Sequence, residues 1–161
     1  MIHGIHHTAI STGDLERALH FYRDVLGFEL VMDHRWSRGV RNMDVTMDLR
    51  DTAARCVLLR AANALLEIFE YESPAPAPGD PDRPLCDHGI THLCLEVDDI
   101  DLEYERLSAA GMRFHHPPVQ NDGARMTYGR DPDGNAIELI EFQRRDEPLV
   151  LARCASNAVS S

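Results

Sequence analysis

Hydrophobic and polar residues follow the same order twice along the chain, which indicates an internal repeat. The pattern of a strand followed by an amphipathic helix occupies residues 5–26 and returns at residues 90–110. Each half then closes on a similar phrase, Leu-Glu-Ile-Phe-Glu-Tyr at 66–71 and Ile-Glu-Leu-Ile-Glu-Phe at 137–142. Self-similarity of this kind predicts two copies of one supersecondary unit.

The start and end of each predicted helix carry the expected signals. Asp14 and Asp99 stand where an N-cap belongs, and Gly27 and Gly111 stand where a helix commonly stops. The other predicted elements are strands. They span residues 28–32, 43–49, 56–60, 65–71, 112–115, 126–128 and 136–142. For residues 43–49 a short helix is the alternative.

Turn and linker residues separate these elements. Asp131-Pro132-Asp133-Gly134 predicts a turn, and the five prolines of residues 72–87 exclude a regular element there. We therefore expect an α+β fold of two tandem βαβββ modules, which form a curved, partly open mixed sheet around a metal-binding trough. The predicted parts are a first module at 1–72, a proline-rich linker at 73–88, a second module at 89–143 and a tail at 144–161 that is frayed from Cys154 to Ser161.

Composition narrows the class of partner. The 161 residues carry a formal charge of −11, so we expect neither nucleic acid nor an anionic membrane as a partner. All 16 basic residues are arginine, which excludes Schiff-base chemistry by lysine. The four cysteines form no Cys-x-x-Cys pair, and neither a signal-peptide pattern nor a membrane-spanning run is present. These features predict a reduced, cytoplasmic protein.

The candidate chemistry lies at matching places in the two halves. His7 and His92 are 85 residues apart, near the start of each repeat, and Glu67 and Glu138 lie near its end. Strand alternation places each of these side chains opposite the apolar face of its strand. A carboxylate within an apolar strand is costly to bury without a partner. If the two modules close on one another, two imidazoles and two carboxylates can hold one divalent cation. His6 is an alternative ligand, but its counterpart in the repeat is Thr91.

The motifs together resemble the vicinal oxygen chelate superfamily, which includes glyoxalase I, methylmalonyl-CoA epimerase, extradiol dioxygenases and the fosfomycin and bleomycin resistance proteins. The similarity covers roughly residues 2 to 143. The motifs that carry it are Ile5-His6-His7-Thr8-Ala9-Ile10, Asp14-Leu15-Glu16-Arg17-Ala18, Phe21-Tyr22-Arg23-Asp24-Val25-Leu26-Gly27-Phe28, Gly89-Ile90-Thr91-His92, and Asp131-Pro132-Asp133-Gly134-Asn135 leading into Ile137-Glu138-Leu139.

The resemblance implies both a metal site and a reaction. It places the family's four metal positions on His7, Glu67, His92 and Glu138, and it implies one divalent ion, either Ni, Co, Zn or Mn. A small-molecule substrate with two neighbouring oxygens would bind there, in an isomerase, epimerase or lyase that removes a proton next to a carbonyl through a metal-stabilised enolate or enediolate. By analogy with glyoxalase I, Glu138 is the first choice for the base, and Glu67 is the symmetric alternative.

Two other functions stay open at this stage. A small extradiol-type dioxygenase would use Fe(II) at the same place, although the presence of Glu67 favours the isomerase or lyase side. A metal-free antibiotic-binding resistance protein would keep the fold without the ligands, whereas here all four positions are of ligating type. The resemblance also implies a homodimer.

Further residues bear on the substrate. Ser11 stands where glyoxalase I has a basic residue for glutathione, and Tyr71 stands where it has an asparagine, so both weaken glutathione as the substrate. An epimerase of this superfamily would take a separate carboxylate base from Asp48 or Asp51. Arginines at 35, 38 and 41 could hold an anionic tail, with a salt-bridged surface loop as the alternative. The remaining candidates for the pocket lining are Trp36, His115 and Tyr128.

Overall fold

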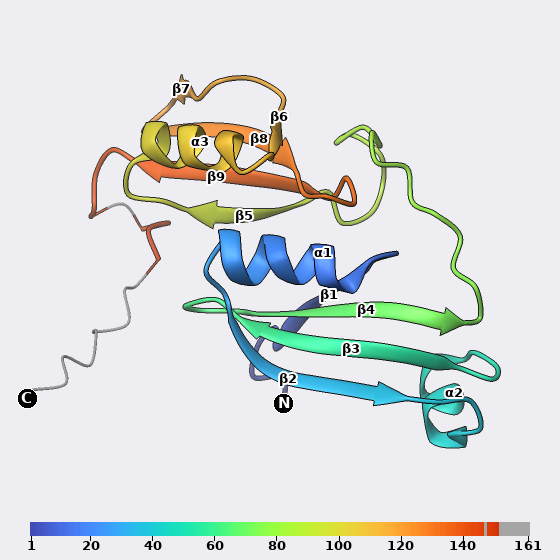
Figure 1. The fold of residues 1–161 in the computed structure, drawn as a ribbon. Coiled ribbons are helices and arrows are strands. Elements are labelled where there is room, and N and C mark those ends of the chain that lie inside the picture. Colours follow the sequence, from blue (N-terminus) through green and yellow to red (C-terminus); the bar gives the residue numbers. More distant parts are fainter. Residues whose placement is uncertain (147, 152–161) are drawn as a thin grey trace, which may run out of the picture. The chain divides into compact units, whose positions relative to one another are not determined.

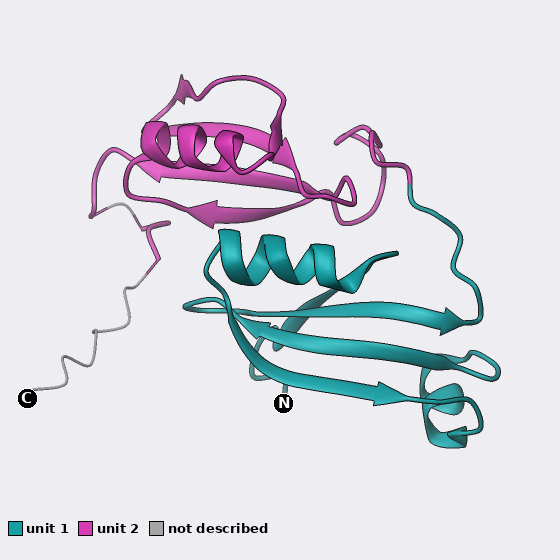
Figure 2. Cartoon of the chain, in the orientation of Figure 1, with its two compact units in different colours: residues 1–79 teal, residues 80–161 magenta. Residues whose placement is uncertain are grey.

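The computed structural model describes residues 1–146 and 148–151, and these form two compact units, 1–79 and 80–161 (Figure 2). The predicted fraying from Cys154 to Ser161 lies outside the described residues. Each unit has its own sheet with a helix on one face, and neither sheet closes into a barrel (Figure 1). The predicted α+β class is confirmed.

Unit 1 contains a four-stranded mixed sheet in the order β1-β4-β3-β2. The parallel pair β1–β4 brings the start of the unit next to its end, and the other pairs are antiparallel. The sheet therefore joins the first strand of the repeat directly to its last strand. The strands are β1 (His7–Ser11), β2 (Glu29–Trp36), β3 (Ala53–Arg60) and β4 (Leu65–Ser73).

The helix of unit 1 covers one face of this sheet. It runs as α1 (Leu15–Leu19) and continues as a π-helix, η1 (His20–Val25). The Asp14 side chain accepts a hydrogen bond from the Arg17 N–H at 3.0 Å, and Gly27 ends the helix at φ +79°, so both predicted signals are confirmed. Leu15, Leu19 and Tyr22 are fully buried, and burial of these apolar side chains stabilises the unit.

The predicted strand at residues 43–49 is wrong, because α2 (Arg41–Met47) occupies this part of the chain. Met43 and Met47 are two residues from Val45 on either side, which fits a strand, but they are also four residues apart, which fits one face of a helix. In the structure both methionines pack against Trp36 and its buried neighbours, and Val45 is exposed. The alternative of a short helix is confirmed.

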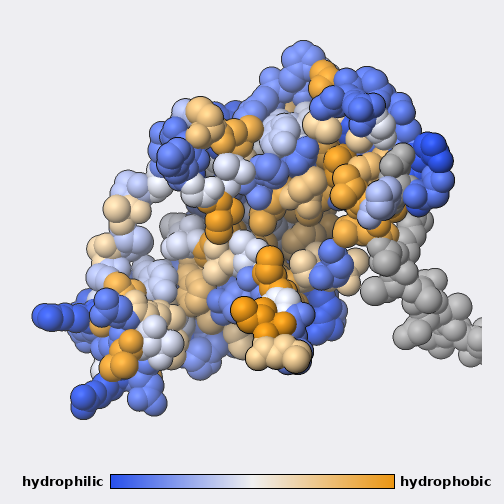
Figure 3. Space-filling view, turned by 180° about the vertical axis from the view of Figure 1, so that it is seen from behind, coloured by the Kyte–Doolittle hydropathy of each residue, from blue (hydrophilic) through white to orange (hydrophobic). Residues whose placement is uncertain are grey.

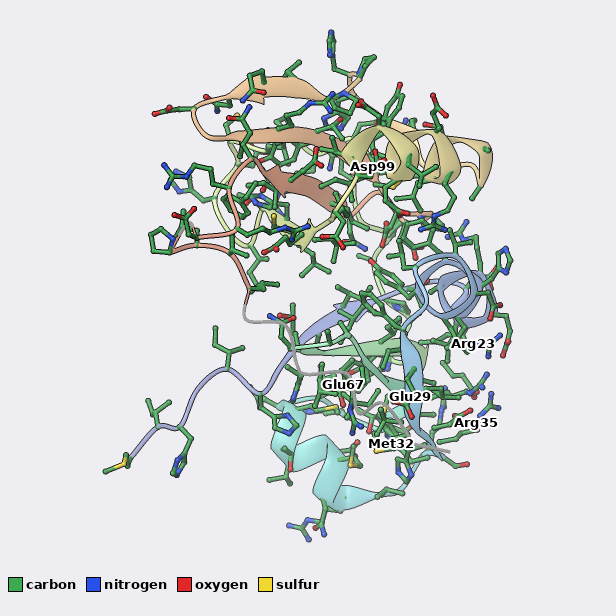
Figure 4. The ribbon with its side chains drawn as sticks, turned by 90° about the vertical axis from the view of Figure 1, so that its left-hand side faces the viewer. Arg23, Glu29, Met32, Arg35, Glu67 and Asp99 are labelled. Carbon is green, nitrogen blue, oxygen red and sulfur yellow. The ribbon has the colours of Figure 1, made fainter. Side chains whose placement is uncertain are left out.

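Unit 2 repeats the arrangement around a second mixed sheet, in the order β5-β9-β8-β6 with β7 paired to β8. Its parallel pair, β5–β9, corresponds to β1–β4 of unit 1. Asp99 caps α3 through the Leu102 N–H at 3.0 Å, and Ile100 and Leu107 of this helix are buried (Figure 4). The elements are β5 (His92–Glu96), α3 (Ile100–Ala109), β6 (Arg113–Phe114), β7 (Val119–Asn121), β8 (Ala124–Arg130) and β9 (Ala136–Phe142).

The predicted turn at residues 131–134 is confirmed and positions β9. The Asp131 carboxylate accepts hydrogen bonds from the backbone N–H groups of Asp133 and Asn135 at 2.9 and 2.7 Å. Gly134 has φ +90°, and a Cβ there would lie 2.2 Å from the Cα of Pro81. The turn therefore requires glycine at this position.

The surface is mixed in character. Hydrophobic side chains reach it in several separate places (Figure 3), and Leu30, Val31 and Met32 of the edge strand β2 are among the exposed ones. Within the described ranges, we find no helix that is both long and apolar enough to span a membrane.

Candidate metal centre

The first His–Glu pair is formed by adjacent parallel strands of unit 1. His7 on β1 is opposite Leu65 of β4, so Glu67 lies two residues further along on the same face. The Nε2 atom of His7 is 3.3 Å from Oε2 of Glu67. Glu67 lies on the central part of the unit 1 sheet in Figure 4, with the buried residues Leu66 and Ile68 on the opposite face of β4. The predicted alternation of this strand is confirmed.

The second pair repeats this geometry in unit 2. His92 on β5 is opposite Ala136 of β9, and Glu138 again lies two residues further along. The distance from His92 Nε2 to Glu138 Oε2 is 3.1 Å. Both pairs therefore occupy the same diagonal of a parallel strand pair, as the internal repeat predicts.

The donor atoms of each pair are spaced as two ligands of one ion would be. Metal–nitrogen and metal–oxygen bonds of about 2.0–2.2 Å, at angles between octahedral and tetrahedral values, put neighbouring donors about 3.0–3.4 Å apart. The two His–Glu distances are 3.3 and 3.1 Å. In addition, the ion-pair partner found for each carboxylate is a histidine rather than an arginine. The chemistry and spacing of the donors thus fit a divalent ion.

Each unit by itself brings together one histidine and one glutamate. Across the part of the chain that the structure describes, no group of three or more His, Cys, Asp or Glu side chains could hold a metal ion. The structure brings His7 to Glu67 and His92 to Glu138, and the convergence of both pairs on one ion stays a prediction.

A polar neighbour holds the far side of each imidazole. The Nδ1 atom of His6 lies 2.8 Å from Nδ1 of His7, and the Thr91 hydroxyl lies 2.8 Å from Nδ1 of His92. Such partners of a ligating histidine orient its ring and set its tautomer. His6, the alternative ligand, therefore contacts the nitrogen of His7 that faces away from Glu67.

Two further residues adjoin the second pair. Tyr128 is opposite Glu138 in the β8–β9 register, and its ring meets the His92 ring edge-on at 5.2 Å. Cys94 is opposite Glu138 in the β5–β9 register. Burial, with the hydrogen bond to Glu138 and its charge, raises the pKa of Tyr128 to about 12. Burial and the charge of Glu138 raise the pKa of Cys94 to about 12 as well.

The sequence predicted Tyr128 as a pocket-lining residue, and the structure places it beside His92 and Glu138. The sequence did not predict that Cys94 lies beside Glu138, because a cysteine in an apolar strand is usually a small buried hydrophobe. The available signal was its spacing of two residues from His92, which puts both side chains on one face of β5.

The other candidates lie in different surroundings. Arg35 and Arg38 form exposed ion pairs with Glu72 at 3.5 Å and Asp51 at 3.3 Å, as a salt-bridged surface would. Asp48 ends α2 in the left-handed conformation at φ 51°. The alternative base positions, Asp48 and Asp51, therefore both follow α2.

Two of the predicted pocket residues are structural. Trp36 is buried, and its indole N–H donates to the Thr52 hydroxyl at 3.0 Å. His115 accepts a hydrogen bond from the Arg130 guanidinium at 3.1 Å, and burial together with that charge lowers the pKa of His115.

Comparison with known proteins places this geometry in a family. Residues 4–139 match the model of the Glyoxalase/Bleomycin resistance protein/Dioxygenase superfamily. A 2-epi-5-epi-valiolone epimerase from Actinomyces sp is 34% identical over 151 residues, which cover 86% of this chain and 79% of that protein. A lactoylglutathione lyase from Haemophilus influenzae is 29% identical over 142 residues, covering 84% and 90%.

A solved structure supports the fold. The glyoxalase family protein from Bacillus cereus superposes with a TM-score of 0.81 at 19% identity, covering 88% of this chain and 95% of that one. The family model matches far more than half of the chain, and the fold agrees with it. The chain belongs to the Glyoxalase/Bleomycin resistance protein/Dioxygenase superfamily.

Proposed function

We propose that the protein is a divalent-metal-dependent enzyme that moves a proton at a carbon next to a carbonyl, as an epimerase, isomerase or lyase. The observation that carries the proposal is the pair of matched His–Glu contacts, 3.3 Å in unit 1 and 3.1 Å in unit 2, on the same diagonal of two parallel strand pairs. Members of this superfamily commonly use divalent metals, and homologues of the chain are lyases and epimerases.

In this proposal His7, Glu67, His92 and Glu138 hold the ion. When bound, a divalent ion polarises a carbonyl oxygen and so acidifies the neighbouring C–H group. The protein's own contribution is a carboxylate beside that carbon, and such a base accelerates proton transfer by typically ~10²–10⁴-fold. Glu138 and Glu67 are the candidates for this role.

The surroundings of Glu67 favour an uncharged substrate body. Strand register places Leu58, Cys56, Phe69 and Tyr71 on the same face of the sheet as Glu67. An apolar and aromatic surface accommodates a neutral carbonyl compound better than it accommodates a multiply charged carrier.

The residues that were candidates for binding an anionic substrate support the same choice. Arg35 and Arg38 are already engaged with carboxylates of the protein. Ser11 also lacks the cationic group that a glutathione carboxylate would need. Epimerisation of a neutral ketone is therefore the form of the reaction that we favour, in line with the 34% identical epimerase.

Proton exchange tests the proposal directly. We expect the purified protein, loaded with Co(II) or Mn(II), to incorporate deuterium from D₂O into 2-epi-5-epi-valiolone, and EDTA to stop the exchange. S-lactoylglutathione serves as the second probe for a lyase. Glu138→Gln and Glu67→Gln should both slow the exchange. The matched control is Glu141→Gln, because Glu141 lies three residues from Glu138 on the opposite face of β9 and faces Arg125 at 3.7 Å.

Three results would contradict this function. Exchange that persists in both glutamate variants would remove the proposed bases. Tight binding of a small molecule by metal-free protein, without exchange, would indicate a binding protein. Consumption of O₂ by the Fe(II)-loaded protein with a catechol would indicate ring cleavage.

A further inference from the structure

Tyr128 touches both ligands of the second His–Glu pair. Its position on β8 is directly across from Glu138 on β9, so the two side chains lie side by side on the same face of the sheet. Its ring also meets the imidazole of His92 edge-on, with the ring centroids 5.2 Å apart. One side chain thus packs against the imidazole and brings a phenolic hydroxyl, a hydrogen-bond donor, to the position beside the carboxylate.

Cys94 restrains the same carboxylate from the other side. It lies on β5, which flanks β9 on the edge opposite β8, and it is paired with Glu138 in the register. Its thiol can donate a weak hydrogen bond. Glu138 is therefore paired on each neighbouring strand with a side chain that can donate a hydrogen bond, in addition to its contact with His92.

The first pair is built on the equivalent strands of unit 1 but lacks these donors. The residues opposite Glu67 are Ala9 on β1 and Leu58 on β3, and neither side chain can donate a hydrogen bond. The Glu67 side chain is 18% exposed and that of Glu138 is 10% exposed. Two carboxylates at equivalent positions of the repeat are thus held to different degrees.

We propose that Tyr128 is a positioning residue that, together with Cys94, holds the Glu138 carboxylate beside His92. The second pair is then preorganised for the metal. Glu67 is the carboxylate that is free to leave the metal. This inference rests on the proposed function. Partners of metal ligands commonly change metal affinity about 10–100-fold when they are removed, because they orient the ligand before the ion arrives. A carboxylate without such partners loses less when it moves away. In this assignment Glu67, rather than Glu138, is the better placed base.

Metal affinity tests the positioning role without a substrate. We would titrate the metal-free protein with Co(II) by calorimetry and compare wild type with Tyr128→Phe, which removes only the hydroxyl. We expect about a 10-fold loss of affinity. Tyr104→Phe is the matched control, because Tyr104 lies on α3 and packs against Phe114 of β6. This variant should bind Co(II) as the wild type does.

Substitutions at Cys94 provide a rescue experiment. Cys94→Ala removes the donor and should weaken Co(II) binding, whereas Cys94→Ser keeps a donor and should restore most of the affinity. Cys86→Ala, in the segment before β5, controls for loss of a thiol. Far-ultraviolet circular dichroism of each variant shows whether the fold is retained.

The two glutamates should then separate in the same titration. Glu138→Gln should lose at least 10-fold more Co(II) affinity than Glu67→Gln. This inference would be overturned by equal losses of Co(II) affinity in the two glutamate variants, or by unchanged Co(II) affinity in folded Tyr128→Phe protein. In either case, binding of Co(II) by the wild type would leave the proposed function intact. Wild-type protein that binds no Co(II) would overturn both.

Discussion

A single ion shared by two His–Glu pairs has a consequence that separate sites would not have. His7 and His92 belong to different units, and each contacts one glutamate of its own unit. If both pairs bind one ion, His7→Ala and His92→Ala must damage the same site. If each pair binds its own ion, each substitution leaves the other site untouched.

The expected size of the effect follows from the number of ligands. A structural zinc site with four protein ligands has an apparent binding free energy of about 10–16 kcal/mol. Divided equally among the four ligands, this gives on the order of 2.5–4 kcal/mol for each. That range corresponds to a loss of roughly 10²–10³-fold in affinity. Because each histidine occupies the same position of its strand pair, we expect both alanine variants to fall within this range.

Competition with a chromophoric chelator measures both affinity and stoichiometry. We expect one tightly bound Zn(II) per chain in wild type, about 10²–10³-fold weaker binding in each single variant and no specific binding in the double variant. His20→Ala is the control, because the exposed His20 side chain pairs with Asp24 at 3.2 Å on the surface of η1. Two ions per wild-type chain, with one retained at full affinity in each single variant, would refute the shared site.

Two further predictions concern the framework. Gly134→Ala should destabilise the protein by at least ~2 kcal/mol, because φ is +90° and the new Cβ would lie 2.2 Å from Pro81. The midpoint of thermal unfolding should fall by about 4–8 °C. Gly13→Ala is the control and should leave the midpoint unchanged, because a Cβ there meets nothing within 4 Å. Asp44→Asn should reduce the acid sensitivity of folding. Hydrogen bonds from Thr52 lower the pKa of Asp44 below its ordinary value, so the stability that the ionised carboxylate contributes is present at neutral pH and is lost as pH falls through the lowered pKa. Urea unfolding at pH 7 and pH 3 measures this effect. The free energies of unfolding of variant and wild type should differ less at pH 3 than at pH 7.

Much of the fold was predictable because the repeat states it twice. The strand predicted at residues 136–142 agrees with β9 at both ends, and Asp14 and Asp99 cap their helices as predicted. These elements combine clear periodicity with strong end signals. A second copy of the pattern removes most of the ambiguity of the first.

The failures share a physical reason, which is that tertiary contacts decide between local alternatives. A four-residue spacing of methionines suits both a strand and a helix, and packing on Trp36 selects α2. The short strand β7 has three exposed residues and no apolar alternation, so only its pairing with β8 identifies it. The repeat identifies the histidines and glutamates of the two pairs in the sequence, whereas the placement of Tyr128 and Cys94 beside Glu138 is visible only in the register between strands.

The repeat also explains why two equivalent carboxylates need not be chemically equivalent. Backbone register is set by the strand pairs and is the same in both units, so the histidine and the glutamate of each pair meet on the same diagonal. The side chains paired with each glutamate are set residue by residue. They are Ala9 and Leu58 for Glu67, but Cys94 and Tyr128, which can donate hydrogen bonds, for Glu138. A metal enzyme that must both retain its ion and move a proton needs one fixed carboxylate and one that can leave. Under the proposed function, a duplicated unit supplies the pair, and divergence at the flanking positions would divide the two tasks.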